Sequence, residues 1–261
     1  MSSLEWVVLE DDGGKTYLVE LVNEVVKIKG LGVFNPAIEL CEKKIGSRVT
    51  IGQKVLTKLS LRLPEIYRSM KRRAQTISSK DAGIFITRLG IGPGDVVVEA
   101  GLGSGGLSLH LARVLGNSGT LITVESRDEH AEVGLENLAR ARDCLPEFPN
   151  HHHLSGDIEL LSEKIAELSG QIDAIILDLP DHKSAIDAVN KLLSDGSRIA
   201  CYCPVTSQIE RAWEACEANG LTVEWAGEMM ERQWGRASKG GIRPVNGPFG
   251  HTAFLLIAHK R

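Results

Sequence analysis

The pattern of apolar and polar positions changes period near residue 79. Before this point, short alternating runs are separated by turn signals such as Asp12-Gly13-Gly14 and Asn23-Glu24, which predicts β-strands. After it, unbroken apolar runs alternate with segments of helical spacing, a pattern typical of an α/β protein with a parallel sheet. We therefore predict a small β-rich domain over residues 1–62 and a larger α/β domain over residues 63–261.

The individual elements follow from these runs and their breakers. In the first domain, strands are expected at Trp6–Leu9, Thr16–Val22, Val25–Ile28, Arg48–Ile51 and Gln53–Leu59, before a linker with a short helix after Pro64. In the second, strands are expected at Val96–Ala100, Thr120–Glu125, His152–Leu154, Asp173–Leu179, Arg198–Tyr202, Thr222–Ala226 and Thr252–His259. Helices are expected at Asp81–Leu89, Gly106–Leu115, Asp128–Asp143 (capped by Asp128), Ile158–Leu168, Lys183–Leu193 and Thr206–Asn219.

The order of these elements predicts a Rossmann-like, doubly wound sheet of seven strands. The last two strands follow each other with no helix between them, only a Gly- and Pro-rich loop at residues 235–250. The final strand should therefore run antiparallel in an otherwise parallel sheet.

The stretch Val96–Ser126 contains most of a nucleotide-type site. Its first strand ends in Glu99-Ala100, the loop Gly101–Gly105 follows, and the next strand ends at Glu125. Glycine tolerates the positive φ of such a turn. An acid at the end of the next strand can accept hydrogen bonds from two ribose hydroxyls. A dinucleotide site prefers G-x-G-x-x-G, with pyrophosphate at the helix N-terminus. The G-x-G-x-G spacing suits S-adenosylmethionine (AdoMet), whose amino-acid end carries no phosphate.

Two more acids end later strands of the predicted sheet. Asp157 either hydrogen-bonds the adenine amine of AdoMet or caps the next helix. Asp178 follows the apolar run at 175–177, and its carboxylate can orient a nucleophilic amine or accept its proton. The complete set expected to contact the cofactor is Glu99, Gly101, Leu102, Gly103, Ser104, Gly105, Leu107, Glu125, Ser126, Asp157 and Asp178.

The histidines give no metal site. His151–His153 would alternate between the two faces of a strand, so we expect a surface loop and strand start, and no metal cofactor. His251 lies between the glycine-rich loop and the final strand, where it either faces the site or makes a structural hydrogen bond.

Whole-chain composition excludes several classes of protein. The 261 residues have a net charge of −4 and are 43% hydrophobic, as is usual for a globular protein. There is no apolar run of about 18 residues, no secretory signal and no CxxC pair among the five cysteines. We therefore expect a cytoplasmic protein with reduced thiols and no membrane span. Basic residues prevail in 1–80 and 232–261 and flank an acidic middle, which indicates either a nucleic-acid partner or an unevenly charged surface.

Together these residues resemble the AdoMet-dependent tRNA adenine-N1 methyltransferases. The similarity covers nearly the whole chain, and the most specific matches are Arg243-Pro244 and Gly250–Leu255. Further matches are Leu63-Pro64-Glu65, Met70-Lys71-Arg72, Ala74–Ala82 and Glu99–Gly105. The resemblance implies methyl transfer to N1 of adenosine 58 in the tRNA T-loop, and in archaeal members also at the neighbouring position 57.

The resemblance also implies roles for individual residues. Glu125 would hold the ribose of AdoMet, Asp157 its adenine, and Asp178 would be the catalytic carboxylate. Gln75, Arg243 and His251 are expected at the edge that faces tRNA. A homotetramer is implied as well.

The chain departs from the family pattern on the substrate side. Ser78-Ser79 stand where members commonly have Tyr-Pro, and Asp181-His182-Lys183 stand where an acid, Pro and Trp are common. The absent aromatic side chains could have stacked on the target base. Two alternatives therefore stay open: a non-catalytic tRNA-binding subunit that pairs with an active partner, and a class I methyltransferase with another substrate.

Overall fold

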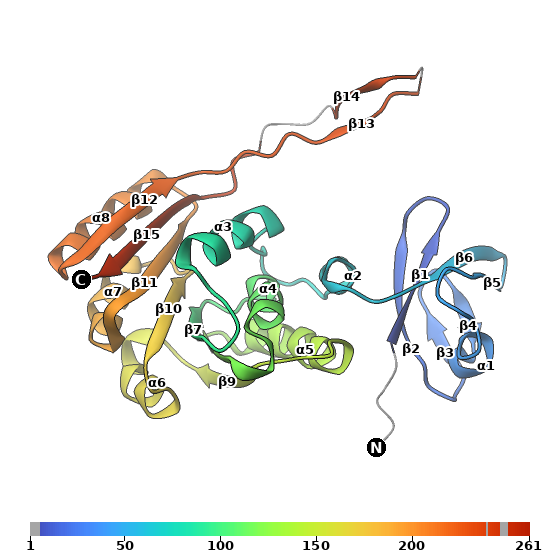
Figure 1. Ribbon diagram of the computed structural model, residues 1–261, viewed down its shortest axis with the longest axis horizontal. Coiled ribbons are helices and arrows are strands. Elements are labelled where there is room, and N and C mark those ends of the chain that lie inside the picture. Colours follow the sequence, from blue (N-terminus) through green and yellow to red (C-terminus); the bar gives the residue numbers. More distant parts are fainter. Residues whose placement is uncertain (1–5, 239, 246–249) are drawn as a thin grey trace.

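The computed structural model describes residues 6–238, 240–245 and 250–261. An N-terminal β domain and an α/β domain are joined by helix α2 (Leu63–Ser69) and the chain that follows it (Figure 1). A thin two-stranded ribbon projects from the α/β domain at the top of the view. No helix within the described ranges is long and apolar enough to cross a membrane.

The N-terminal domain is built on a four-stranded antiparallel sheet in the order β2-β1-β6-β5. These strands are β1 (Trp6–Asp11), β2 (Thr16–Glu20), β5 (Arg48–Ile51) and β6 (Lys54–Leu59). The strands β3 (Val26–Ile28) and β4 (Gly32–Phe34) pair separately, and helix α1 (Pro36–Leu40) follows. The sequence pattern did not predict β4 or α1, because both are too short to show a period. Residues 7–56 of this domain contribute a hydrophobic core of their own. The domain boundary at 62 stays a prediction.

The α/β domain contains the seven-stranded sheet, in the order β12-β15-β11-β10-β7-β8-β9. Its strands are β7 (Val96–Ala100), β8 (Thr120–Glu125), β9 (Asn150–Ser155), β10 (Ile172–Leu177), β11 (Leu193–Cys203), β12 (Leu221–Gly227) and β15 (Phe254–Lys260). β15 lies between β11 and β12 and is antiparallel to both, while β9, β8, β7, β10 and β11 pair in parallel. The predicted fold class is therefore confirmed.

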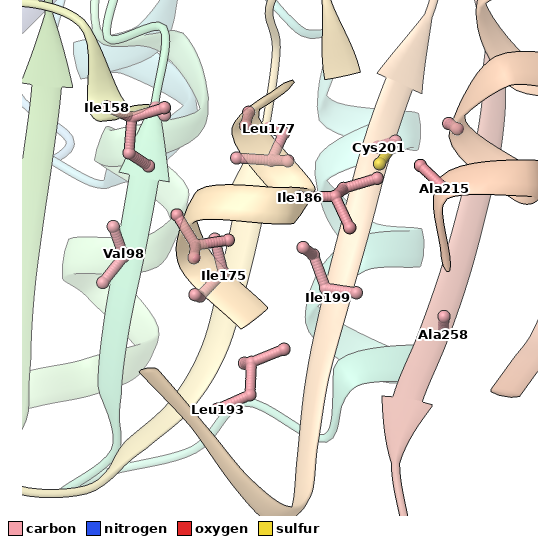
Figure 2. Close-up of a cluster of buried hydrophobic side chains, with 14 of the residues drawn as sticks. Val98, Ile158, Ile175, Leu177, Ile186, Leu193, Ile199, Cys201, Ala215 and Ala258 are labelled. Atoms are coloured by element: carbon pink, nitrogen blue, oxygen red, sulfur yellow. The ribbon is translucent and has the colours of Figure 1, made fainter. Parts of the chain in front are cut away.

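Helices cover both faces of this sheet. They are α3 (Ser79–Leu89), α4 (Gly106–Leu115), α5 (Asp128–Cys144), α6 (Ser162–Leu168), α7 (His182–Val189) and α8 (Thr206–Ala218), with short 3₁₀ turns at Gly116–Ser118, Ile158–Leu160 and Asn190–Leu192. Figure 2 shows the core on the α6–α8 face, where Ile175 and Leu177 of β10 point toward Ile186 of α7. Ile176 between them faces the other way, into the core under α3 and α4. The unbroken apolar run of β10 thus fills both layers, as a central parallel strand requires.

Several predicted details are wrong. Asp128 is the first residue of α5 rather than its cap; the cap position belongs to Arg127, which makes no side-chain capping bond. The helix predicted at Ile158–Leu168 is a 3₁₀ turn followed by α6, because the chain turns at Leu161. The loop predicted at 235–250 instead contains part of a ribbon, β13 (Trp234–Arg236) paired with β14 (Ile242–Pro244). Residues 239 and 246–249 of that loop lie outside the described ranges.

Candidate functional site

The glycine loop and Asp178 meet at the carboxyl edge of the sheet. Asp178 is one residue beyond β10, and its backbone N–H donates to the carbonyl oxygen of Ala100 at 2.9 Å. A Cβ on Gly101, whose φ is 93°, would lie only 2.2 Å from the Asp178 carbonyl oxygen. Only glycine therefore lets the loop pass this close to the strand that carries Asp178.

Two adjoining cavities open at this edge. The first, of about 380 Å³, is lined by eight of the predicted residues: Gln75, Glu99, Gly101, Leu102, Gly103, Ser104, Leu107 and Asp178. The second, of about 610 Å³, is lined by five: Gly101, Glu125, Ser126, Asp157 and Asp178. Gly101, Arg127, Asp178, Leu179 and Pro180 line both. The structure thus brings most of the predicted cofactor residues to one continuous site.

Glu125 is held by three hydrogen bonds at the end of β8. Its Oε2 accepts from the Gly103 N–H at 2.9 Å. Its Oε1 accepts from the backbone N–H of Arg127 at 3.2 Å and from Arg127 Nε at 2.9 Å. Burial raises the pKa of Glu125, but the hydrogen bonds from Arg127 and Gly103 outweigh it and hold the pKa below its ordinary value. The carboxylate is therefore an ionised acceptor at neutral pH.

Buried Glu99 and half-buried Asp178 lie on the wall of the first cavity. Burial raises the pKa of Glu99 to about 8, although the Ser108 hydroxyl donates to its Oε2 at 2.5 Å. Burial also raises the pKa of Asp178 to about 7, against an attraction to Arg127 that lowers it. No described residue donates a hydrogen bond to the Asp178 carboxylate. A cationic ligand here would favour the ionised forms of both acids, because its positive charge would stabilise the carboxylates that burial destabilises.

The chain between α2 and α3 forms one wall of the first cavity. We call residues 70–78 the strap; Ala74 to Ile77 line the cavity directly. Ser104 Oγ accepts from the N–H groups of Arg73 and Ala74, each at 3.0 Å. Asn137 of α5 accepts from Lys71 N at 2.9 Å and donates to the carbonyls of Lys71 and Ser104. The strap is thus fastened to the glycine loop at several points.

Some predicted residues lie elsewhere. Gly105 is the N-cap residue of α4 and packs against Gly134 instead of lining a cavity. Asp157 lines the second cavity and stands at the cap position of the Ile158–Leu160 turn, but its side chain makes no capping hydrogen bond. Arg243 lies on the projecting ribbon (Figure 1). His251 is bonded to Glu228 Oε2 at 2.8 Å and to the Pro204 carbonyl at 3.0 Å, which fits its structural reading.

The positions that depart from the family pattern also have local partners. Ser78 caps α3 by accepting from the N–H of Asp81. His182 is buried at 2% exposure beside the Cys203 sulfur and lines neither cavity. Neither side chain therefore takes the place of a base-stacking aromatic residue.

The sequence reasoning missed several cavity residues. Arg127 and Tyr202 line the first cavity, as does Thr252, whose hydroxyl accepts from Lys80 Nζ at 2.6 Å. Tyr202 ends a predicted strand, so its position carried a signal, whereas an arginine two residues after the predicted ribose acid is ordinary on a surface. Within the described ranges, no group of three or more metal-binding side chains gathers.

Comparison with known proteins finds similarity to methyltransferases over most of the chain. Residues 59–239 match a family described as tRNA methyltransferase complex GCD14 subunit. The chain is 32% identical over 211 residues to the tRNA (adenine(57)-N(1)/adenine(58)-N(1))-methyltransferase TrmI of Methanocaldococcus jannaschii, covering 74% of each chain. It is 32% identical over 204 residues to the tRNA (adenine(58)-N(1))-methyltransferase TrmI of Thermus thermophilus, covering 76% of this chain and 74% of the relative. A solved SAM-dependent O-methyltransferase from Thermotoga maritima is similar with a TM-score of 0.80 and 26% identity, covering 100% of this chain and 94% of that one.

Proposed function

The chain belongs to the tRNA methyltransferase complex GCD14 family, and from this membership we propose that it transfers a methyl group from AdoMet to N1 of adenosine 58 in tRNA. The observation that carries the proposal is the half-buried carboxylate of Asp178, which lines both cavities beside the glycine loop. The second cavity, which Glu125 and Asp157 line, suits the adenosine half of AdoMet. The first suits its methionine end together with a target base.

The residues present fit AdoMet. When bound, it supplies an electrophilic methyl group on a positively charged sulfur. Glu125 offers an ionised carboxylate to the ribose, and Asp157 offers an acceptor to the adenine amine. A bound cation would favour the ionised forms of Glu99 and Asp178, whose pKa values burial raises, so the first cavity suits a cation better than a neutral ligand.

Adenine N1 has a lone pair, so no proton has to leave before the methyl group is transferred. N1 lies on the pairing edge of the base, and the nucleotide has to leave its stack to reach the cavity. Asp178 then accepts a hydrogen bond from the exocyclic amine, which aims N1 at the methyl group. The same carboxylate stabilises the positive charge that develops on the base. Positioning accounts for most of the rate in this mechanism. Tyr202 provides an aromatic surface in the first cavity.

Charge and surface features support tRNA and a homo-oligomer as partners. Basic residues prevail at both ends of the chain, as expected for a surface that meets phosphates. The ribbon exposes Trp234 at 63% and Ile242 at 69%, and a two-stranded ribbon alone is marginal in water. We place this ribbon at the contact between copies of a homotetramer, while Arg243 on it stays a prediction for the edge that faces tRNA. The five free cysteines agree with the cytoplasm.

The direct test uses purified protein, labelled AdoMet and tRNA transcripts, followed by nucleoside analysis. We expect 1-methyladenosine at position 58, and none in a transcript with guanosine there; a transcript with adenosine at both positions scores position 57. Asp178→Ala should bind AdoMet nearly as well as the wild type but lose at least about a hundredfold in transfer. Unchanged turnover would remove Asp178 from the mechanism. AdoMet binding without any transfer would favour the non-catalytic subunit, and transfer to another acceptor would favour a different substrate.

A further inference from the structure

Arg127 and the ribose of the proposed cofactor need the same carboxylate. A carboxylate offers about four lone-pair positions to hydrogen-bond donors. In Glu125, the N–H groups of Gly103 and Arg127 and the Nε of Arg127 already take three of them. One position is left, whereas a ribose diol brings two donors. One of the three present donors therefore has to leave when both hydroxyls bind.

Only one of these donors can leave at low cost. The Gly103 and Arg127 N–H groups belong to the backbone of the glycine loop and of the start of α5. The Arg127 side chain is 56% exposed, whereas that of Glu125 is 2% exposed. Water stabilises the separated guanidinium, and the ribose hydroxyls would replace its hydrogen bond to the buried carboxylate. The Nε of Arg127 is therefore the donor that gives way.

Arg127 also lies in the space that the cofactor would occupy, so the two compete for more than one hydrogen bond. Its side chain lies where the two cavities meet, and it lines both together with Asp178. AdoMet would have to extend through this junction to place its ribose at Glu125 and its methyl group near Asp178. The guanidinium thus meets the same two acids that the cationic cofactor would meet.

We propose that Arg127 is an internal competitor of the cofactor: its guanidinium pairs with Glu125 in exchange with the ribose diol and so sets the affinity for AdoMet and for its product, S-adenosylhomocysteine. This inference rests on the proposed function, since it takes AdoMet as the ligand. After methyl transfer, the returning guanidinium regains its ion pair with Glu125 as the product leaves. Arg127 thereby lowers the affinity for the cofactor and speeds the release of the product.

The test measures S-adenosylhomocysteine affinity by titration calorimetry, with no tRNA and no turnover. Arg127→Met keeps much of the side-chain volume but lacks the donor and the charge, and we expect it to bind about threefold to fivefold more tightly than the wild type. Arg142→Ala, in the last turn of the same helix α5, is the matched control and should leave the affinity unchanged. Weaker or equal binding to Arg127→Met would overturn the proposal, because it would mean that Arg127 supports the ligand or takes no part.

A second ligand separates competition from a general effect of charge. The 2′-deoxy analogue of S-adenosylhomocysteine brings one hydroxyl, which the remaining position on Glu125 can accept without displacing Arg127. We therefore expect Arg127→Met to gain no affinity for this analogue. An equal gain for both ligands would contradict the counting argument. If the wild type binds neither S-adenosylhomocysteine nor AdoMet, the proposed function itself fails, which is a different result.

Discussion

Asp178 combines a half-buried position with a role that needs its charge. The ionised carboxylate can accept a hydrogen bond from the exocyclic amine on either oxygen, whereas protonation turns one of its oxygens into a donor. Because burial raises its pKa to about 7, a large fraction of the protein carries the protonated form near neutral pH. The charge of this one side chain therefore couples transfer to pH.

The pH profile of kcat/KM for AdoMet checks this coupling, because it reports the protein before the cationic cofactor binds. Since the protonated form is inactive, transfer should rise with pH through about 7 and reach a plateau above it. One pH unit below that pKa, the rate should fall to about a tenth of the plateau. AdoMet affinity, measured alongside, separates this effect from the titration of Glu99, whose pKa is about 8. A profile that is flat between about pH 6 and 8 would contradict the assignment.

The acids of the candidate site were predictable, but their neighbours were not. Glu125 and Asp178 each end an apolar run, and a charge at that point has to face a polar edge. Arg127 carries no such sign, because an arginine after a strand is ordinary on a surface. Its importance depends on its distance to Glu125, which only the folded chain defines. His251 was ambiguous in sequence for the same reason, since its partner Glu228 is 23 residues away.

At the scale of elements, the glycine loop depends on a close contact with α5. A Cβ on Gly134 of this helix would lie 2.7 Å from Leu102 Cγ and 2.8 Å from the Gly103 carbonyl oxygen. Helix propensity favours alanine over glycine by about 1 kcal/mol, but here the methyl group would push the loop away from the helix.

We expect Gly134→Ala to destabilise the protein by about 1–3 kcal/mol and to weaken AdoMet binding. Gly83→Ala in α3 is the matched control, because its Cβ would meet nothing within 4 Å. That variant should be neutral or more stable by up to about 1 kcal/mol. Chemical denaturation and AdoMet titration of both proteins check the pair. Equal stability changes in the two variants would show that the loop tolerates a wider spacing.

Periodicity predicted the elements of the sheet well and the short or irregular ones poorly. The run at Val96–Ala100 was assigned with the bounds that β7 has, because buried parallel strands are apolar without interruption. The break at Leu161 was not visible, since a 3₁₀ turn and a helix share nearly the same spacing of apolar residues. The ribbon was missed because glycine and basic residues conceal its short strands.

At the scale of the whole molecule, the ribbon leaves large apolar side chains in contact with water. Met230, Trp234 and Ile242 are each more than 60% exposed on or beside it. Burying these side chains against another copy of the chain would remove apolar surface from water, which favours association.

We expect the double variant Trp234→Ser with Ile242→Ser to lower the molar mass measured by light scattering after gel filtration. Val33→Ser with Ile38→Ser, which changes two equally exposed apolar residues of the N-terminal domain, should leave that mass unchanged. Circular dichroism of both variants checks that the monomers stay folded. A wild type that is monomeric, or a mass that the first pair does not alter, would contradict the homotetramer contact.

The strap has a consequence for how this protein can be divided. A chain that began at α3 would retain every strand of the seven-stranded sheet, yet it would lack the segment that closes one side of the first cavity. Ser104 and Asn137 would then expose donors and acceptors that the strap now satisfies. Chimeras should therefore exchange the N-terminal domain only up to Ser69, with the junction placed before the strap.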